Sequence, residues 1–175
     1  MKKGEPRFFL NWQMPTTISK ALYGATSDAE RSSICQSWLH HTGIDQHLEV
    51  GEAATNTQMG ILQQFTDINS DFAKKQNFTE KKMACFMEIM HYMMGRLVKD
   101  RCDEDASFDI FKELLLRHSI QRPSYSLAIF TLADCKAIDL FALDTFYRHY
   151  DMYLYALTVN DNLNLQCRGM QTLEV

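Results

Sequence analysis

The sequence has few prolines and valines and no long hydrophobic run. Its three prolines stand at positions 6, 15 and 123, and valine occurs only four times. A long stretch without proline and with little valine favours helices over sheets. No apolar run approaches the ~20 residues that a membrane-spanning helix needs, and the first residues lack the apolar segment of a secretory signal. We therefore expect neither a membrane protein nor a secreted one.

Neither positive nor negative charge strongly dominates the sequence. The chain carries 18 basic and 22 acidic residues, for a net charge of −4. Nucleic-acid binding usually requires a basic domain with clustered Lys and Arg, whereas the clusters here are short, such as Lys74-Lys75 and Lys81-Lys82. The composition predicts a solvated surface of mixed charge and no nucleic-acid partner.

Sequence motifs of known catalytic and metal sites are missing as well. The chain contains no glycine-rich phosphate loop, no G-x-S-x-G turn and no H-E-x-x-H helix. Its five cysteines form no C-x-x-C pair, and we expect reduced thiols in a cytosolic compartment. A zinc site would have to combine distant residues such as Cys35 with His40 or His41. We predict a protein that is not an enzyme and that holds no cofactor or metal.

One segment comes close to a calcium-binding loop. Asp67–Asp71 has the D-x-N-x-D opening of an EF-hand. That loop needs glycine at its sixth position and glutamate at its twelfth, where this chain has Phe72 and Phe78, and its ninth position is Lys75. We expect no calcium here, so any calcium response would come through a partner, and the segment reads better as part of a helix.

Hydrophobic spacing predicts one all-α domain, a single globular bundle of five to six helices with flexible termini. Apolar residues three and four apart, together with capping residues, mark each helix. The predicted helices cover about Ser27–His41, Glu52–Lys75, Glu80–Val98 after the cap Thr79, Ser107–His118, and one long helix from the cap Thr131 to Leu157. A charged loop (Asp100–Asp105) and a short extended piece (Tyr125–Phe130) are expected between helices. Residues 1–15 are interpreted as an N-terminal extension, 16–159 as the helical domain and 160–175 as a C-terminal tail.

The third predicted helix is apolar on almost every side. Five of the ten methionines of the chain lie between Met83 and Met94. A helix of this kind is either central in the core or covered by a partner. Methionine fills irregular packing well, which favours the core, and a methionine-rich groove for an amphipathic partner helix is the alternative.

Aromatic residues are dense between Phe146 and Tyr155. They cannot all face one core, and tyrosine is favoured at interfaces because it joins an apolar ring to a polar tip. An aromatic-rich core helix whose hydroxyls reach solvent is the alternative. The predicted partner contacts are Tyr147, Arg148, Tyr150, Tyr153 and Tyr155, with Arg117 and Arg122 as charged supports.

The same region carries a resemblance to a known family. The chain resembles the family of the flagellar C1a complex subunit, the CLAMP-domain proteins of cilia and flagella, in the runs FKELLLRHSIQRPSYSLAIFTLADCKAI and FYRHYDMYLYALT. Upstream, the run FAKKQNFTEKKMACFMEIMHYMM is similar to the same family. The resemblance covers about residues 15–160 and is strongest over 111–158.

The resemblance implies a non-catalytic structural subunit of the motile-cilium or flagellar axoneme, in the C1a projection of the central apparatus. Such a cytoplasmic, cytoskeletal protein would support the regulation of ciliary beating through protein–protein contacts in a hetero-oligomeric complex. The implied partners are a large central-pair scaffold subunit and calmodulin. The chain ends soon after the resembling region, so a role that needs a coiled-coil extension is not expected. The alternative is a soluble helix-binding adaptor in a calmodulin-associated ciliary signalling complex.

Overall fold

The computed structural model describes residues 52–121 and 128–158 and, nearer the N-terminus, five isolated positions. These positions, 24, 30, 33, 34 and 37, are all helical. Most of the predicted helix Ser27–His41 lies outside the described residues, as do Arg122, the predicted extension 1–15, the predicted tail 160–175 and the first half of the predicted extended piece Tyr125–Phe130.

The described residues form helices and no strand. The elements are α3 (Glu52–Lys75), α4 (Glu80–Asp100), α5 (Glu104–Arg117), α6 (Leu132–Thr145), the 3₁₀ turn η2 (Tyr147–His149) and α7 (Tyr150–Leu157). The all-α class is confirmed, and the number of five to six helices for the whole chain stays a prediction. The segment Asp67–Asp71 lies inside α3, as its poor match to a calcium loop indicated. None of the described helices has the length and apolarity to cross a bilayer.

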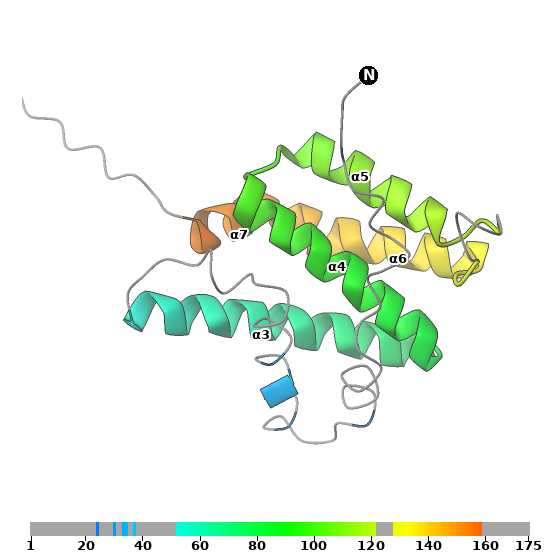
Figure 1. Cartoon of the computed structure of the whole chain (residues 1–175), viewed down its shortest axis with the longest axis horizontal. Helices are drawn as coiled ribbons and strands as arrows, with labels where there is room; N and C mark the ends of the chain where they lie inside the picture. Colours follow the sequence, from blue (N-terminus) through cyan, green and yellow to red (C-terminus); the bar gives the residue numbers. More distant parts are fainter. Residues whose placement is uncertain are drawn as a thin grey trace, which may run out of the picture.

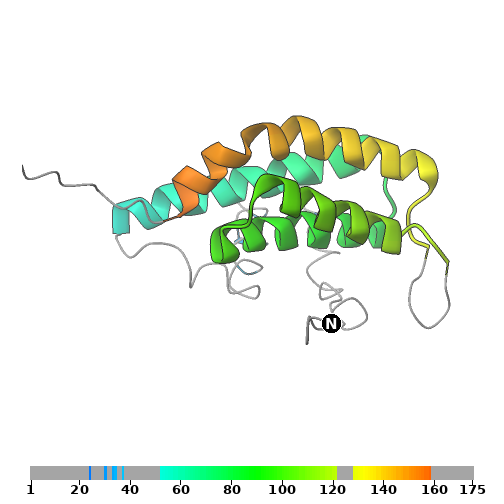
Figure 2. The same ribbon diagram turned by 90° about the horizontal axis from the view of Figure 1, so that it is seen from above.

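The helix α4 occupies the middle of the arrangement. It contacts α3, α5 and α7, and Figure 1 shows α3 on one side of it and α5 on the other. The helices α6 and α7 follow one another behind α4 in that view. The turned view in Figure 2 shows that they cover the bundle on the side away from α4 and α5. A helix in this position must be apolar on most sides, which explains the composition of α4.

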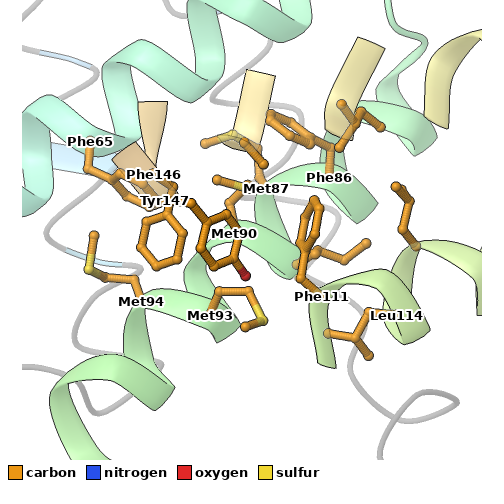
Figure 3. Packing of buried hydrophobic residues seen from close by; sticks show 14 of the residues in the cluster. Phe65, Phe86, Met87, Met90, Met93, Met94, Phe111, Leu114, Phe146 and Tyr147 are labelled. Carbon is orange, nitrogen blue, oxygen red and sulfur yellow. The ribbon is translucent and has the colours of Figure 1, made fainter. Parts of the chain in front are cut away.

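The methionines of α4 belong to the core. Met83 is 2% exposed, and the side chains of Met87, Met90, Met93 and Met94 are completely inaccessible to solvent. Figure 3 shows the last four beside Phe86 of α4 itself and among side chains from the surrounding elements, namely Phe65, Phe111, Leu114, Phe146 and Tyr147. The core interpretation is therefore confirmed. The alternative of an open methionine-rich groove is wrong for this structure, because none of the five methionines lies at the surface.

The connection between α4 and α5 is shorter than predicted. The helix α4 continues to Asp100 and ends at Arg101, which adopts the left-handed conformation with φ 46°. The helix α5 then starts at Glu104, one turn before the predicted Ser107. Asp103 stands at the position before the first turn, and Glu104 begins that turn with a negative charge that suits the helix dipole. The acidic residues that suggested a loop are thus the start of a helix.

The predicted single helix from Thr131 to Leu157 is wrong, because η2 interrupts it after Thr145. In an unbroken helix Tyr147 would stand about 140° round the axis from Ala142. Both side chains are nevertheless buried. The tighter 3₁₀ turn changes the register of the chain, so that Phe146 and Tyr147, neighbours in sequence, both enter the core.

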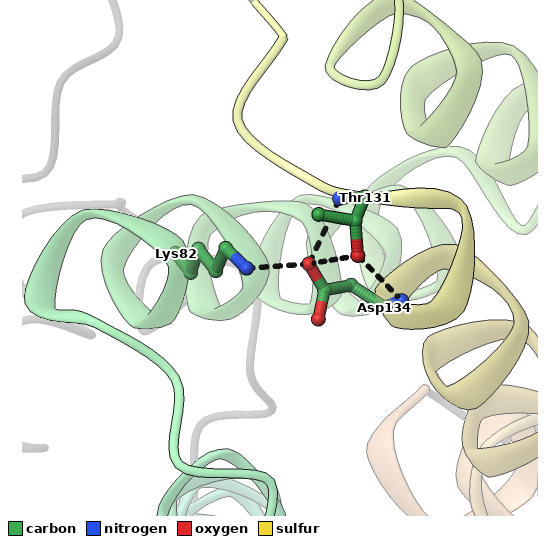
Figure 4. Close-up of polar contacts among 3 residues, drawn as sticks. All are labelled: Lys82, Thr131 and Asp134. Atoms are coloured by element: carbon green, nitrogen blue, oxygen red, sulfur yellow. Dashed lines mark hydrogen bonds and ion pairs between the residues drawn. The ribbon is translucent and has the colours of Figure 1, made fainter.

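The beginning of α6 is held by a capping box that also reaches α4. Thr131 and Asp134 bond each other's backbone amides, with Asp134 N donating to Thr131 Oγ1 at 3.2 Å and Thr131 N donating to Asp134 Oδ2 at 2.8 Å. Lys82 of α4 donates to the same carboxylate oxygen at 2.6 Å, as Figure 4 shows. Partial burial acts to raise the pKa of Asp134, but the bonds from Lys82 and Thr131 outweigh it and hold this pKa below its ordinary value. The carboxylate therefore fixes α6 to the first turn of α4.

Candidate protein-binding surface

Two of the predicted contact residues, Tyr147 and Tyr150, lie in the core. The ring of Tyr147 packs edge-on against Phe108 and Phe146, with centroids 5.0 Å apart in each pair. The Tyr150 hydroxyl donates to the carbonyl oxygen of Cys102 at 2.7 Å. Burial raises the pKa of both hydroxyls. This corrects the prediction for these two residues: a buried side chain cannot contact a partner while the fold is intact.

The other predicted contact residues of η2 and α7 lie nearer the surface. Tyr155 is 71% exposed, whereas Tyr153 is half-buried and packs edge-on against Phe65, with centroids 5.8 Å apart. Arg148 is exposed and forms an ion pair with Asp144 at 2.7 Å. Partner contact through Arg148, Tyr153 and Tyr155 stays a prediction, and Tyr155 presents the largest part of its ring.

The predicted charged support Arg117 lies elsewhere in the bundle. It ends α5 and forms an ion pair with Glu113 of the same helix. The end of α5 lies near the start of α6, while α7 lies at the other end of the bundle (Figure 1). The structure therefore does not bring Arg117 and the tyrosines of α7 together, and Arg122 lies outside the described residues.

Large apolar side chains that the sequence analysis did not select are exposed on α6 and α7. Leu140 is 68% exposed and Met152 is 69% exposed. We call the surface that they share the outer face; its apolar members are Leu132, Leu140, Leu143, Met152 and Tyr155. Helical spacing could have predicted the exposure of Leu140, because this residue stands about 160° round the helix from the buried Ile138.

The outer face continues from one helix to the next. The ion pair between Asp144, near the end of α6, and Arg148, in η2, joins two exposed positions across the junction of these elements. Leu140 precedes Asp144 by four residues within α6, and Met152 follows Arg148 by four residues, so exposed side chains continue from α6 through η2 into α7. Exposed apolar side chains that gather on one face mark sites of protein–protein contact.

The side chains that could bind a metal ion are not clustered in the part of the chain that the structure describes. Within residues 52–121 and 128–158, no three side chains of His, Cys, Asp or Glu are arranged to hold a metal ion. Burial, with a smaller effect of Glu88, raises the pKa of the Cys85 thiol, which is therefore protonated at neutral pH. The suggested zinc ligands Cys35, His40 and His41 lie outside the described residues. The outer face is thus the candidate site that the described residues offer.

The chain matches the model of a known protein family. The family model CLAMP, described as flagellar C1a complex subunit C1a-32, matches residues 69–165, which is more than half of the chain. The matched region begins within α3 and includes α4, α5, α6 and α7 with the whole outer face. The predicted domain limits of 16 and 159 stay a prediction.

Proposed function

This chain belongs to the family of the flagellar C1a complex subunit C1a-32, and we propose that it is a non-catalytic structural subunit of the C1a projection in the central apparatus. Membership of the family makes it a protein of the ciliary or flagellar axoneme, with other axonemal proteins as its partners. In our proposal it supports the regulation of beating by holding neighbouring subunits in place.

The observation that carries the proposal is the outer face. Leu132, Leu140 and Met152 each leave more than two thirds of their surface in water. Permanent assemblies have larger and more hydrophobic interfaces than transient complexes. Such side chains, displayed on two helices above a tightly packed core, support a subunit that is built into an assembly.

The identity of the partners is part of the proposal. We infer that a large central-pair scaffold subunit is the direct neighbour and that calmodulin belongs to the same complex. Calcium would then act through calmodulin, since Asp67–Asp71 forms a turn of α3 and lacks the glycine and the glutamate of a calcium loop.

Fractionation of motile flagella tests this role. We expect the protein to stay in the detergent-insoluble axoneme and to be missing from axonemes of mutants that lack the central pair. Retention without that dependence would move the protein to the doublets or the spokes and would contradict a place in the C1a projection. Release with the detergent-soluble matrix would overturn the structural role and favour the soluble helix-binding adaptor.

A further inference from the structure

We propose that the outer face of α6 and α7 binds an amphipathic helix of another axonemal subunit, and that basic residues border the apolar stripe of this helix. The inference rests on the proposed function and names the kind of partner that the surface fits. The described residues support it through the spacing of the exposed apolar side chains and through the charges beside them.

The apolar side chains are spaced as a helix-binding surface requires. Leu140 and Leu143 are three residues apart on α6, and Met152 and Tyr155 are three residues apart on α7. Residues with this spacing are neighbours on a helix and form a ridge. From Leu132 to Tyr155 the face is about 35 Å long, which matches a partner helix of ~23 residues. The apolar side chains of such a helix can pack between the two ridges.

Two carboxylates beside these ridges have no ion pair. Asp144 is occupied by Arg148, but neither Asp139 nor Asp151 forms an ion pair within the described residues. Asp139 precedes Leu143 by four residues and Asp151 precedes Tyr155 by four, so each carboxylate lies next to an exposed apolar side chain. The two carboxylates are about 18 Å apart along the chain of helices. A partner helix that carries Lys or Arg three turns apart beside its apolar stripe would pair with both.

An exposed lysine makes the charge pattern of the outer face asymmetric. Lys136 is exposed, forms no ion pair in the described part of the chain and lies one turn before Leu140. Along the outer face the unpaired charges therefore run basic, acidic, acidic, from Lys136 through Asp139 to Asp151. Because this order is not symmetric, it distinguishes the two directions in which a helix can lie.

The same charges disfavour two other occupants. A second copy in a symmetric antiparallel pair, centred on the middle of the face, would place Asp139 opposite the Asp151 of its neighbour. Like charges at such an interface oppose association. A membrane surface carries anionic lipids, which repel exposed carboxylates. A basic amphipathic helix has neither disadvantage.

A designed peptide tests the inference on the full-length chain. The probe is a fluorescent helix of ~24 residues with leucines in one stripe and two lysines three turns apart beside it; its control carries glutamates in place of these lysines. We expect fluorescence anisotropy to show that the chain binds the lysine peptide about tenfold more tightly than the glutamate peptide, with an affinity that falls as salt is added. Equal binding of both peptides, or none, would overturn the proposal.

Substitutions then locate the binding surface. The double variant D139K/D151K should reverse the preference between the two peptides. Leu140→Asp should weaken binding of the lysine peptide about tenfold, while Leu116→Asp, at a position of α5 that is 58% exposed, should leave it unchanged. Leu116, Leu140 and Asp151 are exposed and Asp139 is half-buried, and thermal melting confirms that each variant is folded. Equal effects of Leu140→Asp and Leu116→Asp, or an unchanged preference in the charge-reversed variant, would contradict the assignment.

Two further results separate this inference from the proposed function. Dimerisation of the parent chain in ultracentrifugation, abolished by Leu140→Asp, would mean that a second copy covers the face and would overturn the inference. If the peptides show no preference while the protein still depends on the central pair for its place in the axoneme, the interface is wrong and the proposed function stands. If the lysine peptide binds as expected while the protein leaves with the soluble matrix, the proposed function fails and the surface keeps its specificity for basic helices.

Discussion

A buried histidine between α3 and α4 should make the stability of this protein depend on pH. His91 is 2% exposed, its Nε2 lies 3.1 Å from Thr66 Oγ1, and its ring lies beside that of Phe65. Burial lowers the pKa of His91 to about 3. In the unfolded chain the same ring has an ordinary pKa of about 6.5. The folded protein therefore keeps His91 neutral at every pH at which cells work.

The sign and the size of the effect follow from these two pKa values. Below pH 6.5 the unfolded chain takes up a proton at His91 and the folded chain does not, so the free energy of unfolding falls as the pH decreases toward 3. One pKa unit corresponds to about 1.4 kcal/mol. Between pH 7 and pH 5 the loss due to His91 is about 2 kcal/mol, which is a large part of the roughly 5–15 kcal/mol that stabilises an ordinary domain.

Urea denaturation of the parent and of His91→Gln at both pH values measures this contribution. Glutamine offers an amide to the Thr66 hydroxyl but does not titrate, so the variant should lose about 2 kcal/mol less than the parent between pH 7 and pH 5. Other titrating groups contribute to both proteins and cancel in the comparison. The matched control is His149→Gln, which removes an exposed histidine and should follow the parent at both pH values.

Equal losses in the parent and in His91→Gln would refute the reasoning. That result would mean that His91 takes up its proton in the folded protein, which is incompatible with a dry position between α3 and α4. A second measurement checks the same point directly, because the NMR signal of the His91 ring should not move between pH 7 and pH 5 in the folded chain.

Three substitutions test other parts of the packing by urea denaturation at pH 7. Asn69→Leu should raise the free energy of unfolding by about 1–2 kcal/mol, because the side chain of Asn69 is buried and neither of its amide atoms has a hydrogen-bond partner among the described residues; a decrease would show that a buried water or a rearrangement satisfies the amide. Asp134→Asn should lower the free energy of unfolding by about 1–2 kcal/mol, since it removes the charge that Lys82 and the start of α6 share. Stability equal to that of the parent would mean that this ion pair contributes nothing. Tyr150→Phe should lower the free energy of unfolding by about 1 kcal/mol through loss of the bond to the Cys102 carbonyl, and no change would show that solvent reaches this carbonyl.

Local sequence signals predicted the helices where those signals are strong. The spacing of apolar residues marked α3 from Glu52 to Lys75, the limits that the structure has. Thr131 and Asp134 marked the start of α6, because a capping box needs only residues three apart. Short-range interactions of this kind act within one turn, so their residues are visible in the order of the chain.

The same reasoning was incomplete for the candidate site. Tyr147 and Tyr155 have the same side chain and lie on neighbouring elements, yet one is buried against Phe108 and the other is exposed. The η2 turn decides this difference, and the need for it arises from how α7 packs on α4 and α3. Leu140 was not selected because a hydrophobic residue in a helix is usually expected to face the core.

By itself, then, the order of residues determined that this chain is helical, where α3 and the start of α6 lie, and which family it resembles. These properties depend on spacing, on caps and on ordered runs of residues. The tertiary structure alone decided that the methionines of α4 lie inside, that the long helix breaks at η2, and that Leu140, Met152 and Tyr155 form an exposed face. Exposure is set by what packs against a side chain, and those neighbours come from parts of the chain that are far apart in sequence.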